Sequence, residues 1–437
     1  MSRLRTTLEA RGNSPVVLRE QGNVGADDIL RQAIQFSDAI TTRGACRIFS
    51  LDDDPATLLA LLVVAESFPV SLVLGRASAG DVKLPEELEP DVVVRDSGEI
   101  VPGSHYSRDR QTGCAPGIYL LTSGTTGRPK VVHQTLEALT ARMRRESLEK
   151  NRGGIWLLTY EPHSFAGLQV VLSAALSEGA LVMGHGRTAT EICRLARTFR
   201  VSHLSGTPTF WRSLLMAVDS EGLPSLRQIT LGGEAADQGT LDRLQRAFPQ
   251  ARVTHIYAST EAGALFAVND GRAGFPAAWL GEELPGGVRL RIREGMLEVQ
   301  ARSLMQRYAG SHPAPLTEDG WLRTGDLVEV VEDRVLFRGR DDEVINVAGL
   351  KVFPREVEAY LLAHPHVREA RVLAIPNPMT GAVLGAEIVP AAGAPDNLAQ
   401  ELLRACLRDL PAHKVPRRFA MVERIPISSS WKKVAPR

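Results

Sequence analysis

Short strand-like runs alternate with longer helix-like runs between residues 155 and 256. The strand-like runs are 155–158, 180–183, 202–204, 229–231 and 253–256, and the helix-like runs are 168–176, 191–199, 210–218 and 241–248. Strands that alternate with helices are typical of βαβ units, which build a mostly parallel sheet. Ligands of such sheets bind beyond the carboxyl ends of the strands. We therefore expect the functional residues at these strand ends.

The pattern differs on both sides of this region. Before it we expect helices at 29–40 and from Pro55, with Asp54 as N-cap, and strands at 70–74, 92–94 and 118–121. After it we expect a β-hairpin at 288–299 and a strand at 335–337. The tail is predicted to hold helices at 354–362 and 398–410 and strands at 367–375, 386–389 and 419–422. A tail of about a hundred residues with these elements can form a small α+β domain.

The composition excludes several classes of function. Lys plus Arg (51) equals Asp plus Glu (51), so no overall charge favours nucleic acid or an anionic membrane, and a small molecule or a protein is the expected partner. The four cysteines lack Cys-x-x-Cys spacing, which fits neither a disulfide framework nor a zinc site. The longest apolar run, 58–65, is too short to span a membrane, and no apolar signal region follows the N-terminus. We therefore expect a cytoplasmic protein.

The strongest motif follows the strand at 118–121. It consists of Thr122, Ser123, Gly124, Thr125, Thr126 and Gly127, followed by Lys130. The glycines allow the backbone N–H groups to converge on an anion, the hydroxyls add donors, and Lys130 adds a compact positive charge. Pro129 and the residue after Lys130 do not fit a Walker A loop. The sequence therefore predicts a phosphate-binding loop of another type, with a plain Gly/Thr-rich turn as the alternative.

Two more motifs come directly after predicted strands. They are Gly232-Gly233-Glu234, and Tyr257-Ala258-Ser259-Thr260-Glu261. Paired glycines at a strand end are most often a turn, a Tyr can simply pack in the core, and a Glu can cap a helix. Glu261 also suits Mg²⁺, which prefers one or two carboxylates together with substrate phosphates.

A further pair of motifs is Thr324-Gly325-Asp326 and Gly339-Arg340-Asp341-Asp342. The Asp326 carboxylate can accept both hydroxyls of a ribose, and Arg340 can brace ribose or phosphate. A plain loop is the alternative for either motif alone. In their order along the chain, however, all these motifs resemble those of the adenylate-forming superfamily, which includes acyl-CoA synthetases, peptide-synthetase adenylation domains and luciferases. The departures are Val131 and Ala258, which stand where the family usually has Gly.

The resemblance implies a fold and a division into domains. The expected α/β fold has a large N-terminal domain, residues 1–341, of βαβ-type sheets plus a small barrel-like β region. A small mobile α+β domain, residues 342–437, follows, with Asp342 as the hinge between the two.

The resemblance also assigns roles to single residues. It implies that the loop with Lys130 binds the phosphates of ATP, that the backbone of 232–234 meets the adenine, and that Tyr257 stacks on it. Thr260 would contact the α-phosphate and Glu261 would hold Mg²⁺. Lys432 matches the catalytic lysine, but Trp431 stands where the family has Gly, so Lys433 and a merely solvated basic tail remain alternatives.

The substrate pockets are less distinct in the sequence. Residues 160–167 take the place of the family's acid-pocket segment, with His163 or Phe165 expected over the substrate carboxylate and Gly167, Gly206 and Thr207 expected nearby. A lone His at a strand end is otherwise more often structural. The segment 347–358 resembles the loop that lines the thiol tunnel, and this places Gly349 and Lys351 there.

The activity implied by the resemblance is ATP-dependent and Mg²⁺-dependent activation of a carboxylic acid as an acyl-adenylate. The acyl group would then pass to a thiol, that of coenzyme A or of a carrier-protein pantetheine. No general base is required, because an acid with a pKa of about 4 to 5 is ionised at neutral pH. One alternative is an amine or another small nucleophile as acceptor. A second is a non-catalytic nucleotide-binding relative, motivated by Trp431, Val131 and a short segment before the phosphate loop; Lys432, Glu261 and Asp326 argue against it.

Overall fold

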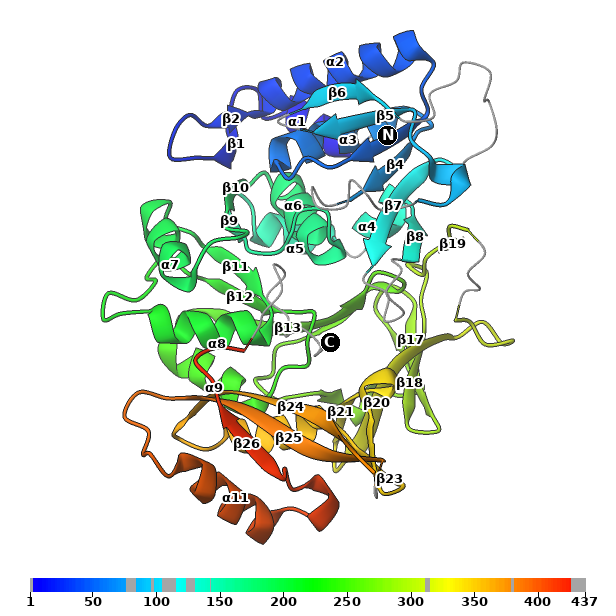
Figure 1. Cartoon of the computed structure of the whole chain (residues 1–437). Coiled ribbons are helices and arrows are strands. Elements are labelled where there is room, and N and C mark those ends of the chain that lie inside the picture. The colour runs from blue at the N-terminus through cyan, green and yellow to red at the C-terminus, as the bar shows by residue number, and fades with distance from the viewer. Residues whose placement is uncertain are drawn as a thin grey trace.

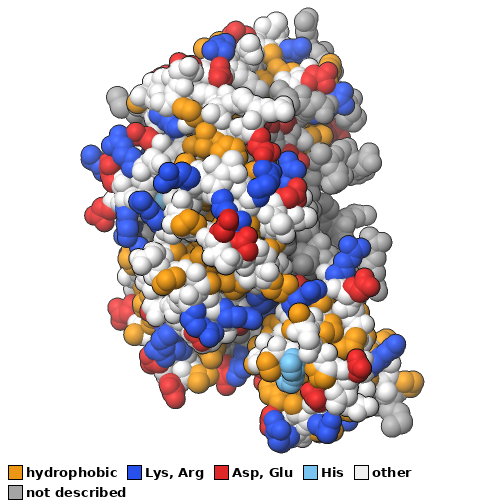
Figure 2. Space-filling model, turned by 90° about the vertical axis from the view of Figure 1, so that its left-hand side faces the viewer, with side chains coloured by type: hydrophobic (Ala, Val, Ile, Leu, Met, Phe, Trp, Pro, Cys, Tyr) orange, Lys and Arg blue, Asp and Glu red, His pale blue; other side chains and the backbone are white. Residues whose placement is uncertain are grey.

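The computed structural model describes residues 3–75, 84–95, 98–103, 115–122, 130–141, 143–310, 315–378 and 381–425. Three larger sheets and a separate C-terminal unit make up this part of the chain (Figure 1). Positive and negative side chains are interspersed on the face seen in Figure 2, in keeping with the balanced charge. Among the described residues, no helix combines the length and the apolar character that crossing a membrane requires.

The predicted βαβ region forms an eight-stranded sheet in the order β14-β13-β12-β11-β9-β10-β1-β2. Its strands are β14 (Gly263–Val268), β13 (Arg252–Ser259), β12 (Gln228–Leu231), β11 (His203–Gly206), β9 (Ile155–Leu158), β10 (Ala180–Met183), β1 (Pro15–Leu18) and β2 (Val24–Gly25). The pairs from β13 to β1 are parallel, and only β14 and β2 are antiparallel edges. The predicted parallel sheet is therefore confirmed.

Four helices connect these strands, and their starts have a local cause. They are α6 (Phe165–Leu176), α7 (Ala189–Thr198), α8 (Pro208–Ala217) and α9 (Gln238–Ala247). Each follows a Ser, Thr or Asp whose side chain accepts a hydrogen bond from a backbone N–H three residues later. Such caps satisfy an N–H group that has no partner inside the helix. The four predicted helices thus begin where the sequence supplies a cap.

A seven-stranded sheet lies above it in Figure 1, in the order β19-β8-β7-β4-β3-β5-β6. Its strands are β19 (Arg307–Tyr308), β8 (Lys130–Gln134), β7 (Gly117–Thr122), β4 (Ser71–Leu74), β3 (Arg47–Ser50), β5 (Val92–Arg95) and β6 (Glu99–Pro102). The accompanying helices are α1 (Arg3–Glu9), α2 (Ala26–Arg43), α3 (Pro55–Ser67), α4 (Leu136–Thr140) and α5 (Arg145–Lys150). Leu58 of α3 and Leu168 of α6 belong to one hydrophobic cluster that joins this sheet to the eight-stranded sheet.

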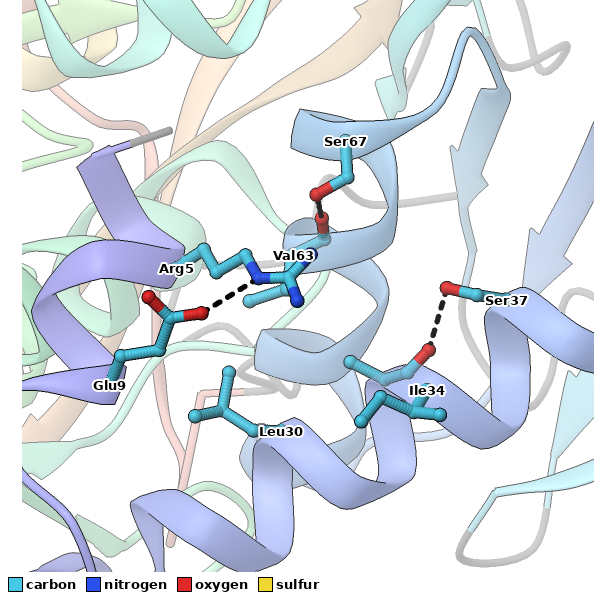
Figure 3. Close-up of a pocket in the computed structure, with 8 residues that line it drawn as sticks. Arg5, Glu9, Leu30, Ile34, Ser37, Val63 and Ser67 are labelled. Atoms are coloured by element: carbon cyan, nitrogen blue, oxygen red, sulfur yellow. Dashed lines mark hydrogen bonds and ion pairs between the residues drawn. The ribbon is translucent and has the colours of Figure 1, made fainter. Parts of the chain in front are cut away.

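Helix α3 begins at Pro55 as predicted, but Asp54 does not cap it. The Asp54 side chain makes no capping hydrogen bond and instead accepts one of 2.6 Å from Arg19 Nη2. Every residue from Pro55 to Val64 is buried, so packing holds this helix without the cap. Its outer side, with α1 and α2, borders a groove of about 150 Å³ with Leu30, Ile34 and Val63 in its lining (Figure 3).

The small β region is a six-stranded antiparallel sheet in the order β15-β21-β20-β18-β17-β16. The strands are β15 (Phe275–Pro276), β21 (Arg334–Arg340), β20 (Leu322–Val331), β18 (Met296–Gln300), β17 (Val288–Arg293) and β16 (Glu283–Leu284). The predicted hairpin is β17–β18, and its turn residues Glu294 and Gly295 both have positive φ, 53° and 77°. A two-residue hairpin turn whose twist matches that of its strands requires a positive φ at both turn residues.

The C-terminal unit has its own core. It contains β22 (Ile345–Val347), β23 (Leu350–Val352), α10 (Pro354–Leu362), β24 (Val367–Asn377), β25 (Gly381–Pro390), α11 (Leu398–Asp409) and β26 (Arg418–Met421). Its buried apolar residues, among them Val357, Leu361 and Leu402, form a cluster within the unit. This agrees with the predicted α+β tail. Cys406 of α11 and Cys193 of α7 are buried, whereas Cys46 is exposed.

Candidate functional site

The two ends of the predicted phosphate loop lie side by side. Thr122 ends β7 and Lys130 begins β8; they are paired across the two strands, and Thr122 Oγ1 donates a hydrogen bond of 3.2 Å to the Lys130 carbonyl. The residues between them to which the sequence assigns phosphate binding, Ser123, Gly124, Thr125, Thr126 and Gly127, lie outside the described residues. The base of the loop is therefore closed, and it places Lys130 at the edge of the site.

Tyr308 links Lys130 to Glu261. It lies on β19, opposite Val132 of β8, and is 4% exposed. Its hydroxyl donates a hydrogen bond of 3.1 Å to Glu261 Oε1, and Lys130 Nζ lies 5.3 Å from the centre of its ring. Burial and the Glu261 carboxylate raise the pKa of Tyr308, so the hydroxyl keeps its proton. Tyr308 belongs to none of the sequence motifs, and a two-residue strand carries no periodic signal that could have indicated it.

The backbone around Glu261 is held on two sides. Gln134 Nε2 donates to the Thr260 carbonyl (2.9 Å), the Met305 amide to the Glu261 carbonyl (2.6 Å), and Ser303 Oγ to the Ala262 carbonyl (2.8 Å). Ser259 Oγ accepts a hydrogen bond from the Ala262 amide. Three carbonyls in a row thus have partners from distant segments. This arrangement fixes the position from which the Thr260 and Glu261 side chains project.

The donor set around Glu261 fits a magnesium ion that arrives with phosphates. Among the described residues, no group of three or more His, Cys, Asp or Glu side chains could hold a metal ion. Mg²⁺ usually keeps several waters and takes one or two carboxylates together with substrate phosphates. Glu261 supplies one such carboxylate. Its Oε1 accepts the hydrogen bond from Tyr308, and its Oε2 does not take part in that bond.

The second cluster joins β13, β20 and β21. Tyr257 donates a hydrogen bond of 2.5 Å to Asp326 Oδ2, and Arg340, which pairs with Asp326 across the two strands, lies 3.6 Å from Oδ1. Burial raises the pKa of Asp326 above its usual value, and the Tyr257 hydrogen bond and the Arg340 charge offset only part of this shift. Gly325 has a φ of 77°, and a Cβ there would lie 3.0 Å from Arg340 Nη2. The glycine of the Thr-Gly-Asp motif therefore gives Arg340 room beside the carboxylate.

The ring of Tyr257, for which stacking on adenine is predicted, packs against two other rings. The centroids of Phe266 and Phe337 lie 5.2 and 5.0 Å from it, with interplanar angles of 25° and 27°. Burial raises the pKa of Tyr257 well above its usual value, and the Asp326 carboxylate adds to the shift. The hydroxyl is therefore a fixed donor to Asp326.

The Gly232-Gly233-Glu234 segment leaves β12 beside Tyr160. Tyr160 donates a hydrogen bond of 3.1 Å to the Gly232 carbonyl, and a Cβ at Gly232 would meet no atom closer than 3.6 Å. Gly233 has a φ of 82°. The Glu234 carboxylate accepts hydrogen bonds from the Thr209 amide and hydroxyl and so caps α8. The side chain of Glu234 is thus structural, whereas a side chain at Gly232 would make only ordinary van der Waals contacts with the protein.

The predicted acid-pocket residues are closely packed. His163 is 3% exposed; its Nε2 lies 3.3 Å from Ser50 Oγ and its Nδ1 3.7 Å from Asp53 Oδ1. Burial lowers the pKa of His163. Phe165 is the first residue of α6 and is 9% exposed. A role of either side chain over a substrate carboxylate stays a prediction.

Packing also explains the small residues predicted there. A Cβ at Gly167 would lie 2.0 Å from the Glu161 carbonyl, and one at Gly206 would lie 2.1 Å from the Phe210 ring. Thr207 is buried, and its hydroxyl caps α8. These positions therefore require their residue types for the fold, whatever they contribute to substrate binding.

The predicted hinge and thiol-path residues lie at the start of the C-terminal unit. Asp342 is exposed in the short 3-10 helix η4 (Asp341–Glu343), 3.4 Å from Arg340 Nε. The segment of Gly349 and Lys351, expected as a loop, is a β-hairpin formed by β22 and β23, with Ala348 and Gly349 in its turn at φ 53° and 84°. Lys432 lies outside the described residues.

Comparisons with known proteins agree with this arrangement. The family model for the AMP-binding enzyme matches residues 78–301, and that for the AMP-binding enzyme C-terminal domain matches residues 356–432. The p-hydroxybenzoic acid–AMP ligase FadD22 of Mycobacterium tuberculosis is 29% identical over 364 residues, which cover 78% of this chain and 50% of that protein. The 2-succinylbenzoate–CoA ligase of Bacillus pumilus is 30% identical over 332 residues, which cover 72% of this chain and 66% of the ligase.

The fold also has solved counterparts. The o-succinylbenzoate CoA synthetase MenE of Bacillus subtilis, in complex with its acyl-adenylate intermediate, superimposes with a TM-score of 0.75 at 20% identity, covering 99% of this chain and 96% of that one. At this identity the likeness concerns the fold. The chain spans about half the length of the FadD22 ligases that it matches.

Proposed function

Because the chain belongs to the AMP-binding enzyme family, we propose that it activates a carboxylic acid with ATP and transfers the resulting acyl group to a thiol. The observation that carries the proposal is the convergence of Lys130 and Glu261 on Tyr308. A cation at the base of a phosphate loop and a carboxylate suited to Mg²⁺ are the groups that a triphosphate requires. The Asp326–Arg340 pair supplies the group suited to a ribose.

The residues act on the first step by alignment and charge. A carboxylate oxygen of the acid attacks the α-phosphorus of ATP, the bond from this phosphorus to the β-phosphate oxygen breaks, and pyrophosphate leaves with its electron pair. Lys130 and the predicted Lys432 stabilise the negative charge on the phosphates, and Thr260 donates to the α-phosphate. Mg²⁺ held by Glu261 adds charge neutralisation when bound.

In the second step a thiol sulfur attacks the acyl carbonyl, and AMP leaves. We propose that residues 342–437 turn about Asp342 between the two steps and bring Gly349 and Lys351 to the thiol path. The thiol belongs to coenzyme A or to the pantetheine of an acyl carrier protein. Reduced thiols and ATP are available in the cytoplasm, where we place the reaction.

We further propose an aromatic acid as the substrate. The support comes from the relatives, whose names specify p-hydroxybenzoic acid and 2-succinylbenzoate.

The test is exchange of labelled pyrophosphate into ATP over a panel of aromatic, aliphatic and amino acids. We expect exchange with at least one aromatic acid, its loss in Lys130→Ala, and its retention in Lys150→Ala, an exposed lysine at the end of α5. Nucleotide binding without exchange for any acid would instead support a non-catalytic relative. Products formed with coenzyme A, a carrier protein or an amine then identify the acceptor.

A further inference from the structure

We propose that Tyr308 is a positioning residue that orients Glu261 toward the metal–triphosphate and holds Lys130 over the same phosphates. This inference rests on the proposed function, because it takes Glu261 as the metal carboxylate and Lys130 as the phosphate cation. Tyr308 contacts both side chains, one through its hydroxyl and one through its ring face. The three residues are far apart in the sequence, and only the fold brings them together.

The position of Tyr308 is fixed by the residues that flank β19. The Gln306 amide donates to the His133 carbonyl (3.0 Å), and the Ala309 amide donates to the Val131 carbonyl (2.8 Å). Hydrogen bonds to β8 thus flank Tyr308 on both sides, and the side chain is buried. Since β8 begins at Lys130, the same strand carries the lysine and anchors the tyrosine.

A tyrosine hydroxyl suits this role because it is a neutral donor. It fixes Glu261 through Oε1, while the carboxylate retains its full negative charge for a cation at Oε2. An Arg or Lys in the same place would neutralise the carboxylate and compete with the metal. Donors that orient a metal ligand in this way affect metal affinity although they do not touch the ion.

The ring acts in the same manner on Lys130. An ammonium group within about 6 Å of a ring centre is attracted to the ring face, and the distance here is 5.3 Å. This attraction restricts a flexible side chain without neutralising its charge. Tyr308 therefore places a cation and a carboxylate next to each other and leaves both charges available to the ligand.

The experiment separates the hydroxyl from the ring. Binding of Mn²⁺ together with a non-hydrolysable ATP analogue is measured by electron paramagnetic resonance and calorimetry, without turnover. We expect Tyr308→Phe to lower the Mn²⁺ affinity about 10- to 100-fold and to leave the affinity for the metal-free analogue nearly unchanged. Tyr308→Leu, which also lacks the ring, should lower both affinities.

Tyr360→Phe is the matched control. The Tyr360 hydroxyl also donates to a carboxylate, that of Asp409 at 2.6 Å, but within the C-terminal unit. This variant should bind Mn²⁺ like the wild type. A Tyr308→Phe protein with wild-type melting temperature and wild-type Mn²⁺ affinity would overturn the inference.

A double-mutant cycle tests whether Tyr308 acts through Glu261. We expect Tyr308→Phe to cause little further loss of Mn²⁺ affinity in a Glu261→Gln background; an equal loss in both backgrounds contradicts the mechanism, even if Tyr308→Phe is less stable. A wild-type protein that binds neither the analogue nor Mn²⁺ would overturn the proposed function itself. If instead the wild type binds both ligands and Tyr308→Phe binds them equally well, the proposed function stands and only the role of Tyr308 is overturned.

Discussion

The Tyr257 hydroxyl donates a hydrogen bond of 2.5 Å to Oδ2 of Asp326, although 69 residues separate the two in the sequence. The other oxygen, Oδ1, faces Arg340 at 3.6 Å. Both oxygens of the carboxylate proposed to bind the ribose are therefore already oriented. A ribose hydroxyl that approaches Asp326 must share an oxygen with Tyr257 or take its place.

Asp326→Asn should remove the discrimination between ATP and its deoxyribose analogues. A hydrogen bond to a charged group contributes about 1.5 to 3 kcal/mol, so we expect the wild type to bind 2′-deoxy-ATP or 3′-deoxy-ATP about 10- to 100-fold more weakly than ATP. The Asn variant should bind all three with similar affinity. Calorimetric titration measures this. Asp319→Asn, at an exposed carboxylate paired with Arg291, is the control, and equal discrimination in Asp326→Asn would rule out the ribose role.

Gly232→Ala should weaken ATP binding without weakening the fold. A Cβ at Gly232 would lie 3.6 Å from the Tyr160 hydroxyl and 4.0 Å from the Ile256 carbonyl, which are ordinary van der Waals contacts, so the added methyl group clashes with no protein atom but would meet an adenine placed against this backbone. At Gly206, by contrast, a Cβ would lie 2.1 Å from the Phe210 ring. We expect Gly206→Ala to lower the melting temperature and Gly232→Ala to raise only the dissociation constant of ATP. Unchanged ATP affinity in Gly232→Ala would place the adenine elsewhere.

Lys432→Ala should abolish formation of the acyl-adenylate but leave thioester formation from a supplied acyl-adenylate largely intact. The lysine charge is needed while negative charge develops at the α-phosphate, an effect of about 3 to 4 kcal/mol when a single donor is removed. Pyrophosphate exchange and single-turnover thioester formation measure the two steps. Selective loss in Lys433→Ala instead would move the assignment by one residue, and equal loss of both steps in Lys432→Ala would refute it.

Asp342→Pro should retain pyrophosphate exchange and lose most thioester formation. Proline fixes φ near about −65° and removes an N–H donor, so it should hold the C-terminal unit in one orientation. Asp342 is exposed in the first turn of η4, a position at which proline is tolerated in helices. Asp342→Ala is the control, because it removes the carboxylate without fixing the backbone. This variant should keep the larger part of thioester formation. Parallel loss of both steps in a well-folded Asp342→Pro protein would contradict a two-orientation mechanism.

We expect the free energy of unfolding to fall in mild acid because His203 is buried in its neutral form. Burial, with a smaller contribution from the Arg227 charge, lowers the pKa of His203 from 6.5 to about 4. Between these values the unfolded chain binds a proton that the folded chain does not, so the free energy of unfolding falls as the pH falls. The free energy of unfolding falls by about 1.4 kcal/mol per pH unit in this range, so the loss due to His203 reaches about 3 kcal/mol at pH 4. Above the pKa of the unfolded chain His203 causes no further change.

His203→Phe is the variant that checks this prediction. A phenyl ring can retain the stacking of His203 on Trp156, whose centroid lies 4.3 Å away, but it cannot be protonated. Urea unfolding at several pH values between 7 and 4 should show a shallower decline for the variant than for the wild type. Identical slopes would mean that His203 does not contribute to the acid sensitivity.

The local features of this chain could be predicted from the sequence. The strands at 155–158 and 180–183 and the helix at 354–362 have the predicted bounds. Adjacent residues mark these bounds, because a glycine precedes each strand and Pro354 is a favoured first residue of a helix. The motifs that end in Lys130, Glu261 and Asp326 were visible for the same reason. Short elements outside this alternation, such as β1 and β19, were missed; β19 has only two residues and therefore carries no periodic signal.

What the tertiary structure alone decided is which of these side chains meet. Asp54 precedes its helix as predicted, yet its carboxylate binds Arg19 instead of capping the helix, because a charged partner from a distant segment competes with the local N–H group. Tyr308 belongs to no motif, but the pairing of β19 with β8 places it between Lys130 and Glu261. Strand pairing brings together residues that are far apart in the chain, and this proximity is a property of the folded sheet that no local pattern encodes.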